Sequence, residues 1–266
     1  MSKRLIFDQP YATRYVEARQ AALREFLPDL MRDLGLHTAV DVGCGVGYFS
    51  TFLREMGFDV LALDARLGNV EEAAERHPEI AFRVANVEDP AIQEHGAFDL
   101  VFCFGLLYHL ENPLRAFRNL FALTRKLLLV ESMAVPGERP ILHLQDEPPL
   151  EDQSVTSIGC YPTEASLIKI AGHVGFPHVY RLSRLPNHEE FEATWGRKRR
   201  RTMLACAKLP LNHPSLALAQ KPAHTDPWDN AGARALRPLY LFSRFLRKPW
   251  NAKLETLRRR LGRAAP

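Results

Sequence analysis

The residues best suited to chemistry lie in two short stretches of the sequence. The first, residues 40–49, reads VDVGCGVGYF: an apolar run, a glycine-rich turn and then helix-forming residues. Such a turn brings backbone N–H groups and a helix N-terminus close to a nucleotide-like ligand, because glycine carries no side chain to block the approach. Asp64 stands 21 residues after Gly43, at the end of the next apolar run. At that separation a carboxylate can accept the hydrogen bonds of a ribose diol, so the pattern predicts a site for a nucleotide-like ligand.

The second stretch, residues 104–113, reads FGLLYHLENP and follows another apolar run. His109 is the candidate catalytic residue, because imidazole titrates near neutral pH and can take a proton from a hydroxyl nucleophile. A histidine at this place could instead cap the next helix. Tyr108 either shapes the reactive pocket or is an aromatic residue of the core. Glu131, at the end of a later apolar run, is either a substrate contact or a solvated strand end.

The glycine spacing distinguishes two kinds of nucleotide site. A dinucleotide fingerprint needs a third glycine where this sequence has Tyr48. The observed spacing, G-x-G-x-G preceded by Asp41, resembles motif I of the class I S-adenosylmethionine-dependent methyltransferases. The resemblance implies S-adenosylmethionine as the cofactor, with the loop under its methionine part and the acid of the second strand on its ribose. The residues that it implies as cofactor contacts are Asp41, Gly43, Cys44, Gly45, Gly47, Asp64, Ala65, Asn86, Val87 and Phe104.

Two further features refine this resemblance. Asn86 stands where the family usually has an acid that accepts a hydrogen bond from the adenine amino group. An amide oxygen can accept the same bond. The alternative role of Asn86 is to turn the chain after the strand. Residues 105–113 are closer to a subgroup that includes bacterial enzymes modifying the tRNA wobble uridine, and residues 160–163 fit the same subgroup. There, the tyrosine matching Tyr108 helps to recognise a carboxylated cofactor. The N-terminus has no counterpart of that enzyme's carboxylate-binding extension, which favours ordinary S-adenosylmethionine.

The elements that must position these residues form an alternating series. Apolar runs that predict strands occur at about 38–42, 58–63, 80–85, 98–103 and 126–131, with helical patterns between them. This alternation predicts an α/β fold with a doubly wound, mainly parallel sheet. The resemblance implies a Rossmann-like sheet of seven strands, the last antiparallel. A helix is predicted over 11–34, where Tyr11, Arg14 and Tyr15 either reach the cofactor's methionine carboxylate or belong to the helix surface.

Three regions are expected along the chain: a methyltransferase domain over 1–210 with a lid-like insertion at 134–162, a linker over 211–233, and basic amphipathic helices over 234–266. The net charge of +4 divides into −10 for residues 1–194 and +14 for residues 195–266. Five consecutive cations at 197–201 are interpreted as a solvated turn. The basic tail could dock on the acidic body or lie peripherally on the inner membrane surface. Binding to nucleic acid is a third alternative, which is disfavoured because aromatic residues are not interleaved with the cations.

These observations favour an enzyme that methylates an oxygen of a small-molecule, glycan- or lipid-linked acceptor. The alternatives are a tRNA-modifying methyl or carboxymethyl transferase and a non-catalytic, membrane-associated cofactor-binding protein. A nicotinamide dehydrogenase is disfavoured by Tyr48. Four scattered cysteines indicate a cytoplasmic protein with reduced thiols, dispersed histidines predict no metal site, and no apolar run approaches the length of a membrane span.

Overall fold

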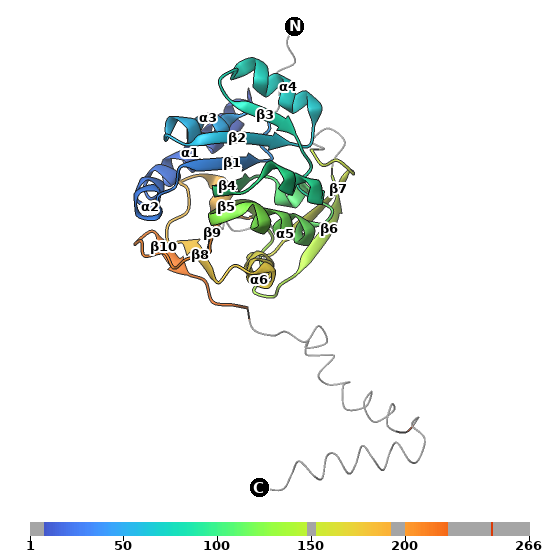
Figure 1. The fold of residues 1–266 in the computed structure, drawn as a ribbon. Helices are drawn as coiled ribbons and strands as arrows, with labels where there is room; N and C mark the ends of the chain where they lie inside the picture. Colours follow the sequence, from blue (N-terminus) through green and yellow to red (C-terminus); the bar gives the residue numbers. More distant parts are fainter. Residues whose placement is uncertain (1–7, 148–152, 193–199, 223–245, 247–266) are drawn as a thin grey trace. The chain divides into compact units, whose positions relative to one another are not determined.

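The structure, a computed structural model, describes residues 8–147, 153–192, 200–222 and residue 246. Within this part of the chain the centre is an eight-stranded sheet, drawn in Figure 1. Its strands, in chain order, are β1 (Thr38–Val42), β2 (Asp59–Asp64), β3 (Ala81–Val84), β4 (Phe98–Phe104), β5 (Thr124–Ala134), β8 (His178–Leu182), β9 (Arg200–Ala207) and β10 (Leu216–Leu218).

The order of the strands predicts a ligand site at the carboxyl ends of the central strands. The spatial order is β10-β8-β9-β5-β4-β1-β2-β3, and the pairs among β1 to β5 are parallel. The chain order reverses between β1 and β4, and ligands of open α/β sheets bind at such a switch point, outside the carboxyl ends of the strands. The expected α/β fold with a mainly parallel sheet is thus confirmed.

Helices cover both faces of the sheet. They are α1 (Pro10–Arg24), α2 (Leu27–Leu34), α3 (Tyr48–Glu55), α4 (Leu67–Arg76), α5 (Pro113–Leu123) and α6 (Glu164–Val174), with short 3-10 turns η2 (Pro90–His95), η3 (Leu107–His109) and η4 (Glu189–Phe191). Adjacent strand residues such as Leu100 and Val101 belong to two different buried clusters. One cluster includes α1 to α4 and the other includes α5 and α6, because successive side chains of a strand point to opposite faces.

The single helix predicted over 11–34 is two helices, with the break at Glu25 and Phe26. Pro28 lies in the first turn of α2. Proline has no N–H to donate, and its ring collides with the carbonyl group four residues earlier, so an uninterrupted helix could not continue through this position. Gly35 ends α2 in the left-handed conformation, with φ 58°, as expected from its place in the sequence.

Two segments differ from the prediction. The insertion at 134–162 contains an antiparallel pair, β6 (Leu142–Asp146) with β7 (Ile158–Pro162). The pair was not predicted, because β6 is exposed and lacks the alternation of buried and exposed residues that a half-buried strand shows. The stretch predicted as a linker contains β10, which pairs antiparallel with β8. The sheet therefore has one strand more than the seven expected. Its last described strand along the chain, β10, is antiparallel to β8, and β9 is antiparallel to both of its neighbours, β5 and β8.

The basic amphipathic helices predicted over 234–266 lie outside the described residues, apart from residue 246. Among the residues that the structure does describe, no helix is both long enough and apolar enough to cross a membrane.

Candidate active site

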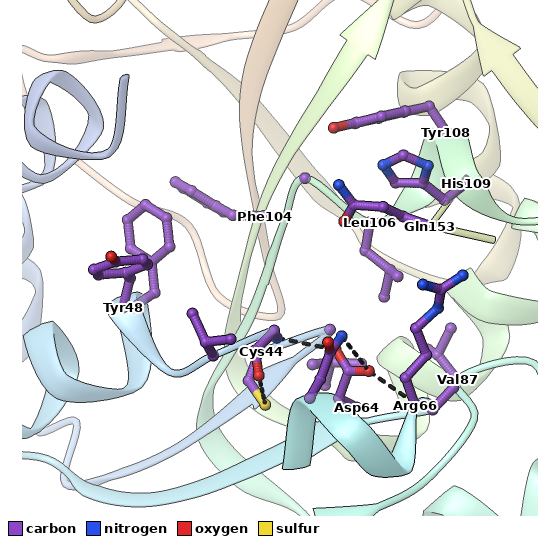
Figure 2. A pocket seen from close by; sticks show the side chains of 18 of the residues that line it. Cys44, Tyr48, Asp64, Arg66, Val87, Phe104, Leu106, Tyr108, His109 and Gln153 are labelled. Atoms are coloured by element: carbon purple, nitrogen blue, oxygen red, sulfur yellow. Dashed lines mark hydrogen bonds between the residues drawn. The ribbon is translucent and has the colours of Figure 1, made fainter. Parts of the chain in front are cut away.

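A cavity of about 440 Å³ opens at the carboxyl ends of the central strands. This volume lies within the usual range for small-molecule sites. Figure 2 shows Cys44 and Asp64 on one side of the cavity, Phe104 near its middle, and Tyr108 and His109 on the other side. The predicted site residues that line it are Gly43, Cys44, Gly45, Asp64, Ala65, Asn86, Val87, Phe104, Tyr108 and His109.

The glycine loop owes its shape to left-handed backbone at Gly43 (φ 78°), Gly45 (φ 55°) and Gly47 (φ 92°). Residues with a β-carbon adopt this conformation only at a cost. The N–H groups of Gly43 and Cys44 both donate to the carbonyl oxygen of Leu63, at 2.7 and 3.0 Å. These two donors hold the loop against β2, so they are not the ligand donors that the sequence suggested. The loop instead allows close approach of its backbone to the cavity.

Asp64 joins the loop to the end of β2. Its carboxylate accepts hydrogen bonds from the backbone N–H of Gly45 at 2.9 Å, the backbone N–H of Arg66 at 2.8 Å and the side-chain amide of Asn69 at 3.1 Å. The side chain is largely buried, and burial raises the pKa of Asp64 against the opposing effect of these donors. A carboxylate held this rigidly at the wall of the cavity is well placed for a ribose diol.

Three predicted site residues do not line the cavity. Asp41 is buried and accepts a hydrogen bond from the Ser50 hydroxyl at 2.7 Å; burial raises the pKa of Asp41 to about 7. A β-carbon on Gly47 would lie 3.0 Å from His77, so this glycine serves packing and the start of α3. Glu131 is fully buried, which corrects the solvated strand end considered for it. The three residues support the wall without facing the cavity.

The turn after β3, expected from the sequence to lie beside the adenine, lines the cavity. The side-chain oxygen of Asn86 accepts the backbone N–H of Glu88 at 2.9 Å, so Asn86 does turn the chain. This oxygen has a second lone pair and Asn86 lines the cavity, so its role as an acceptor for adenine stays a prediction. Glu88 also lines the cavity, and its carboxylate accepts the backbone N–H of Asn112 at 2.6 Å.

His109 contacts a carboxylate from the β6–β7 insertion. Its Nδ1 is the hydrogen-bond partner of Glu147 Oε1, while Glu147 Oε2 accepts the backbone N–H groups of Gln153 at 2.8 Å and Ser154 at 3.2 Å. Burial alone would raise the pKa of Glu147, but His109 and the two backbone donors outweigh it and lower that pKa below its usual value. The carboxylate therefore stays ionised and fixes the imidazole with Nδ1 toward Glu147, as in a base–orienter pair.

Beyond Tyr108, a cluster of buried charges closes the cavity. Glu131 pairs with Arg19 and with Arg201, each at 3.1 Å, and accepts the Tyr15 hydroxyl at 2.8 Å. Burial raises the pKa of Tyr15 well above its ordinary value, so the phenol stays protonated and donates. The two guanidinium groups line the cavity, whereas Glu131 lies behind them. The positive charges thus face the cavity and their counter-charge does not.

Comparison with known proteins decides the family. A model of the methyltransferase-domain family matches residues 15–180, which is more than half of the chain. The chain belongs to the methyltransferase-domain family.

Curated relatives of the methyltransferase resemble it over a limited segment. The ubiquinone biosynthesis O-methyltransferase of Xanthomonas campestris pv. campestris (strain B100) is 36% identical over 87 residues, which is 30% of this chain and 35% of that protein. The protein of the same name from Xanthomonas oryzae pv. oryzae (strain PXO99A) is 35% identical over 89 residues, or 30% of this chain and 36% of the relative. The match thus spans about a third of the length of these relatives.

Solved structures share the fold of the methyltransferase. The N-terminal domain of EvdMO1 with SAH bound superposes with a TM-score of 0.57 at 18% identity, over 72% of this chain and 80% of that chain. The magnesium protoporphyrin IX methyltransferase ChlM from Synechocystis PCC 6803, with bound SAH, gives a TM-score of 0.52 at 18% identity, over 79% and 90%. At these identities the likeness concerns the fold alone.

Sequence reasoning missed three functional candidates in the methyltransferase. Arg19 lines the cavity in place of the predicted Arg14, and its spacing of four residues after Tyr15 would have placed both on one helix face. Arg201 belongs to the run of cations interpreted as a solvated turn, yet it lies on β9, where residues 201–207 are all buried. Glu147 had no signal, because the insertion that carries it lacks periodicity.

Gly159 on β7 is a sensitive point of contact between the insertion and η3. A β-carbon there would lie 2.6 Å from the backbone oxygen of Tyr108 and 3.2 Å from Glu147. Gly159→Ala is therefore expected to destabilise the methyltransferase by about 1–3 kcal/mol and to lower methyl transfer by moving Glu147 away from His109. Urea unfolding and initial rates measure the two effects. The control is Gly68→Ala on α4, where a β-carbon meets nothing within 4 Å; equal behaviour of the two variants would contradict the prediction.

Proposed function

We propose that this methyltransferase transfers the methyl group of S-adenosylmethionine to a hydroxyl oxygen of a small-molecule, glycan- or lipid-linked acceptor, with His109 as the general base. The observation that carries the proposal is the contact between His109 and buried Glu147 in the cavity that Asp64 and the glycine loop also line. The relatives named as O-methyltransferases support the choice of oxygen.

S-adenosylmethionine is the cofactor, and the residues present fit it. Asp64 would hold the ribose, and the turn after β3 would cover the adenine. Arg19 would pair with the methionine carboxylate: within the described chain its Nη2 has no hydrogen-bond partner, although the residue is only 6% exposed. No described side-chain nitrogen or oxygen atom that is fully buried lacks a partner, so this nitrogen faces the cavity. The two solved structures with SAH bound support the same cofactor.

His109 and Glu147 supply the proton chemistry. When bound, the cofactor would supply a methyl group on a sulfonium sulfur. Transfer of this methyl group to the acceptor oxygen would leave the sulfur as a neutral thioether. A hydroxyl oxygen is a poor nucleophile until its proton is removed. Glu147 holds Nδ1 of the imidazole, so Nε2 is the nitrogen that takes this proton. The ionised carboxylate then stabilises the imidazolium that results. Aromatic side chains at 104 and 108 exclude water from the reacting atoms.

Two substitutions test the base. His109→Ala is expected to lower kcat by about 10²–10⁴-fold with little effect on cofactor affinity, since a general base contributes that much. Glu147→Gln is expected to give a loss that approaches the loss in His109→Ala, because an imidazole held in the wrong tautomer cannot act as the base. The glutamine oxygen must stay on the backbone donors of Gln153 and Ser154. Its NH₂ group then faces Nδ1 and forces the proton onto Nε2.

The measurement is transfer of labelled methyl groups to a panel of catechols, hydroxybenzoates and hydroxyquinones, with S-adenosylhomocysteine affinity measured by calorimetry. His143→Ala is the control, because His143 is an exposed histidine on β6 that does not line the cavity. Full transfer rates in both His109→Ala and Glu147→Gln would remove His109 from the mechanism. The tRNA-modifying alternative and membrane contact through the C-terminal tail stay predictions.

A further inference from the structure

The charged residues that line the cavity are distributed unevenly. The carboxylates, Asp64 and Glu88, follow β2 and β3, where the nucleoside is expected, and Arg66 lines the cavity beside Asp64 at the same end (Figure 2). At the opposite end the described charged side chains are cations: Arg19 from α1 and Arg201 from β9. This end therefore favours an anion.

Arg201 lies on the acceptor side of the cavity. The cofactor groups discussed above come from β1, β2, β3 and β4, whereas β9 pairs with the far side of β5. Arg201 is opposite Met133 in that pair, at the carboxyl end of β5. It is therefore separated from β2 and β3, at the nucleoside end, by three strands, β5, β4 and β1. With Arg19 assigned to the methionine carboxylate, Arg201 is the described cation at this end that is left for a group of the second substrate.

The guanidinium of Arg201 is held rigidly without using all its donors. Nε donates to Glu190 at 3.3 Å, Nη1 to Glu131 at 3.1 Å and to the Tyr108 hydroxyl at 3.3 Å, and Nη2 to the same hydroxyl at 3.2 Å. A guanidinium has five N–H groups, and these four contacts leave one N–H of Nη2 without an acceptor among the described residues. Arg19 adds the cavity-facing Nη2 described above. Neither Glu131 nor Glu190 lines the cavity.

Tyr108 links this cationic end to the base. The guanidinium carbon of Arg201 is 5.1 Å from the centre of the Tyr108 ring, and the centre of the His109 ring is 4.1 Å from it. One small molecule lying along Tyr108 can therefore reach both groups.

We propose that the acceptor is a hydroxy acid, whose carboxylate binds Arg201 while its hydroxyl group faces His109. This inference rests on the proposed function and names the substrate class for the same site. The carboxylate would accept the remaining N–H of Arg201 and orient the hydroxyl by this charge-assisted contact. An acceptor without an anion would lose that contact.

The test compares each member of a probe panel with its uncharged amide. The probes are 2-, 3- and 4-hydroxybenzoate, 3,4-dihydroxybenzoate and 3-hydroxybutyrate, together with the corresponding carboxamides. Binding to the full chain is measured by calorimetry in saturating S-adenosylhomocysteine, which keeps Arg19 and the cofactor's carboxylate site occupied. At least one acid is expected to bind 10-fold or more tightly than its amide. Arg201→Gln is expected to reduce this preference to within about twofold while S-adenosylhomocysteine affinity is retained.

Arg201→Lys and Arg14→Gln complete the design. The lysine variant keeps the charge and is expected to keep part of the preference, which guards against a folding defect in Arg201→Gln. Arg14 is exposed and does not line the cavity, so Arg14→Gln should keep the full preference. No acid preferred over its amide by the wild type, or a preference that persists in Arg201→Gln, would overturn the proposal. The binding measurement needs no turnover, so the two proposals can fail separately. If the wild type keeps its preference for the acid while His109→Ala transfers methyl groups at an unimpaired rate, only the O-methylation proposal is contradicted.

Discussion

Asp64→Ala is expected to weaken S-adenosylmethionine binding by at least about 100-fold. Two hydrogen bonds from the ribose diol to a carboxylate are worth about 1.5–3 kcal/mol each, so their loss alone accounts for this factor. The substitution also removes the acceptor of the Gly45 and Arg66 backbone N–H groups, so the bonds from Gly43 and Cys44 to Leu63 are left to hold the glycine loop against β2. Calorimetry with S-adenosylhomocysteine measures the effect.

The matched control is Asp59→Ala. Asp59 begins the strand that Asp64 ends, and it is exposed at the opposite edge of the sheet. Its variant should bind the cofactor as the wild type does. Asp64→Asn provides a second comparison, because asparagine keeps one acceptor oxygen but turns an NH₂ group toward backbone donors. Wild-type affinity in Asp64→Ala would show that this carboxylate does not hold the ribose.

Glu131→Gln is expected to lower the free energy of unfolding by about 3–5 kcal/mol, the usual cost of removing one partner from a buried ion pair. Glu131 is fully buried between Arg19 and Arg201, whose side chains are 7% and 11% exposed. Without the carboxylate, two guanidinium groups remain close together in a poorly solvated place with no counter-charge between them. Urea unfolding of the protein without cofactor gives the free energy directly.

Glu55→Gln is the control for this prediction. Glu55 pairs with Arg24 at 3.8 Å, but both side chains are more than half exposed, and exposed ion pairs contribute little to stability. The unfolding midpoint of Glu55→Gln should therefore stay close to that of the wild type. Similar midpoints for Glu131→Gln and Glu55→Gln would mean that the buried cluster is not a source of stability.

The methyltransferase illustrates which parts of a site can be derived from local pattern. The glycine loop and Asp64 were predicted because each depends on a short stretch: left-handed backbone needs glycine, and an acid at the end of the second strand follows from the length of a βαβ unit. His109 was recognised for the same reason, as a titratable residue directly after a buried strand. The alternation of apolar runs predicted the parallel sheet, in which these stretches meet at the carboxyl ends of the strands.

The sequence by itself therefore determined the cofactor half of the site, where function depends on residues close together along the chain. Only the tertiary structure decided the other half. Glu147 meets His109 across 38 residues, and Arg201 meets Glu131 across 70. Neither pair can be predicted from the residues around it. The strand before Glu147, β6, is exposed, and β9 begins within the run of cations at 197–201. From the sequence alone, a charged side chain at these positions is predicted to be solvated. Only the long-range pairing of strands decides which charged side chains are buried together.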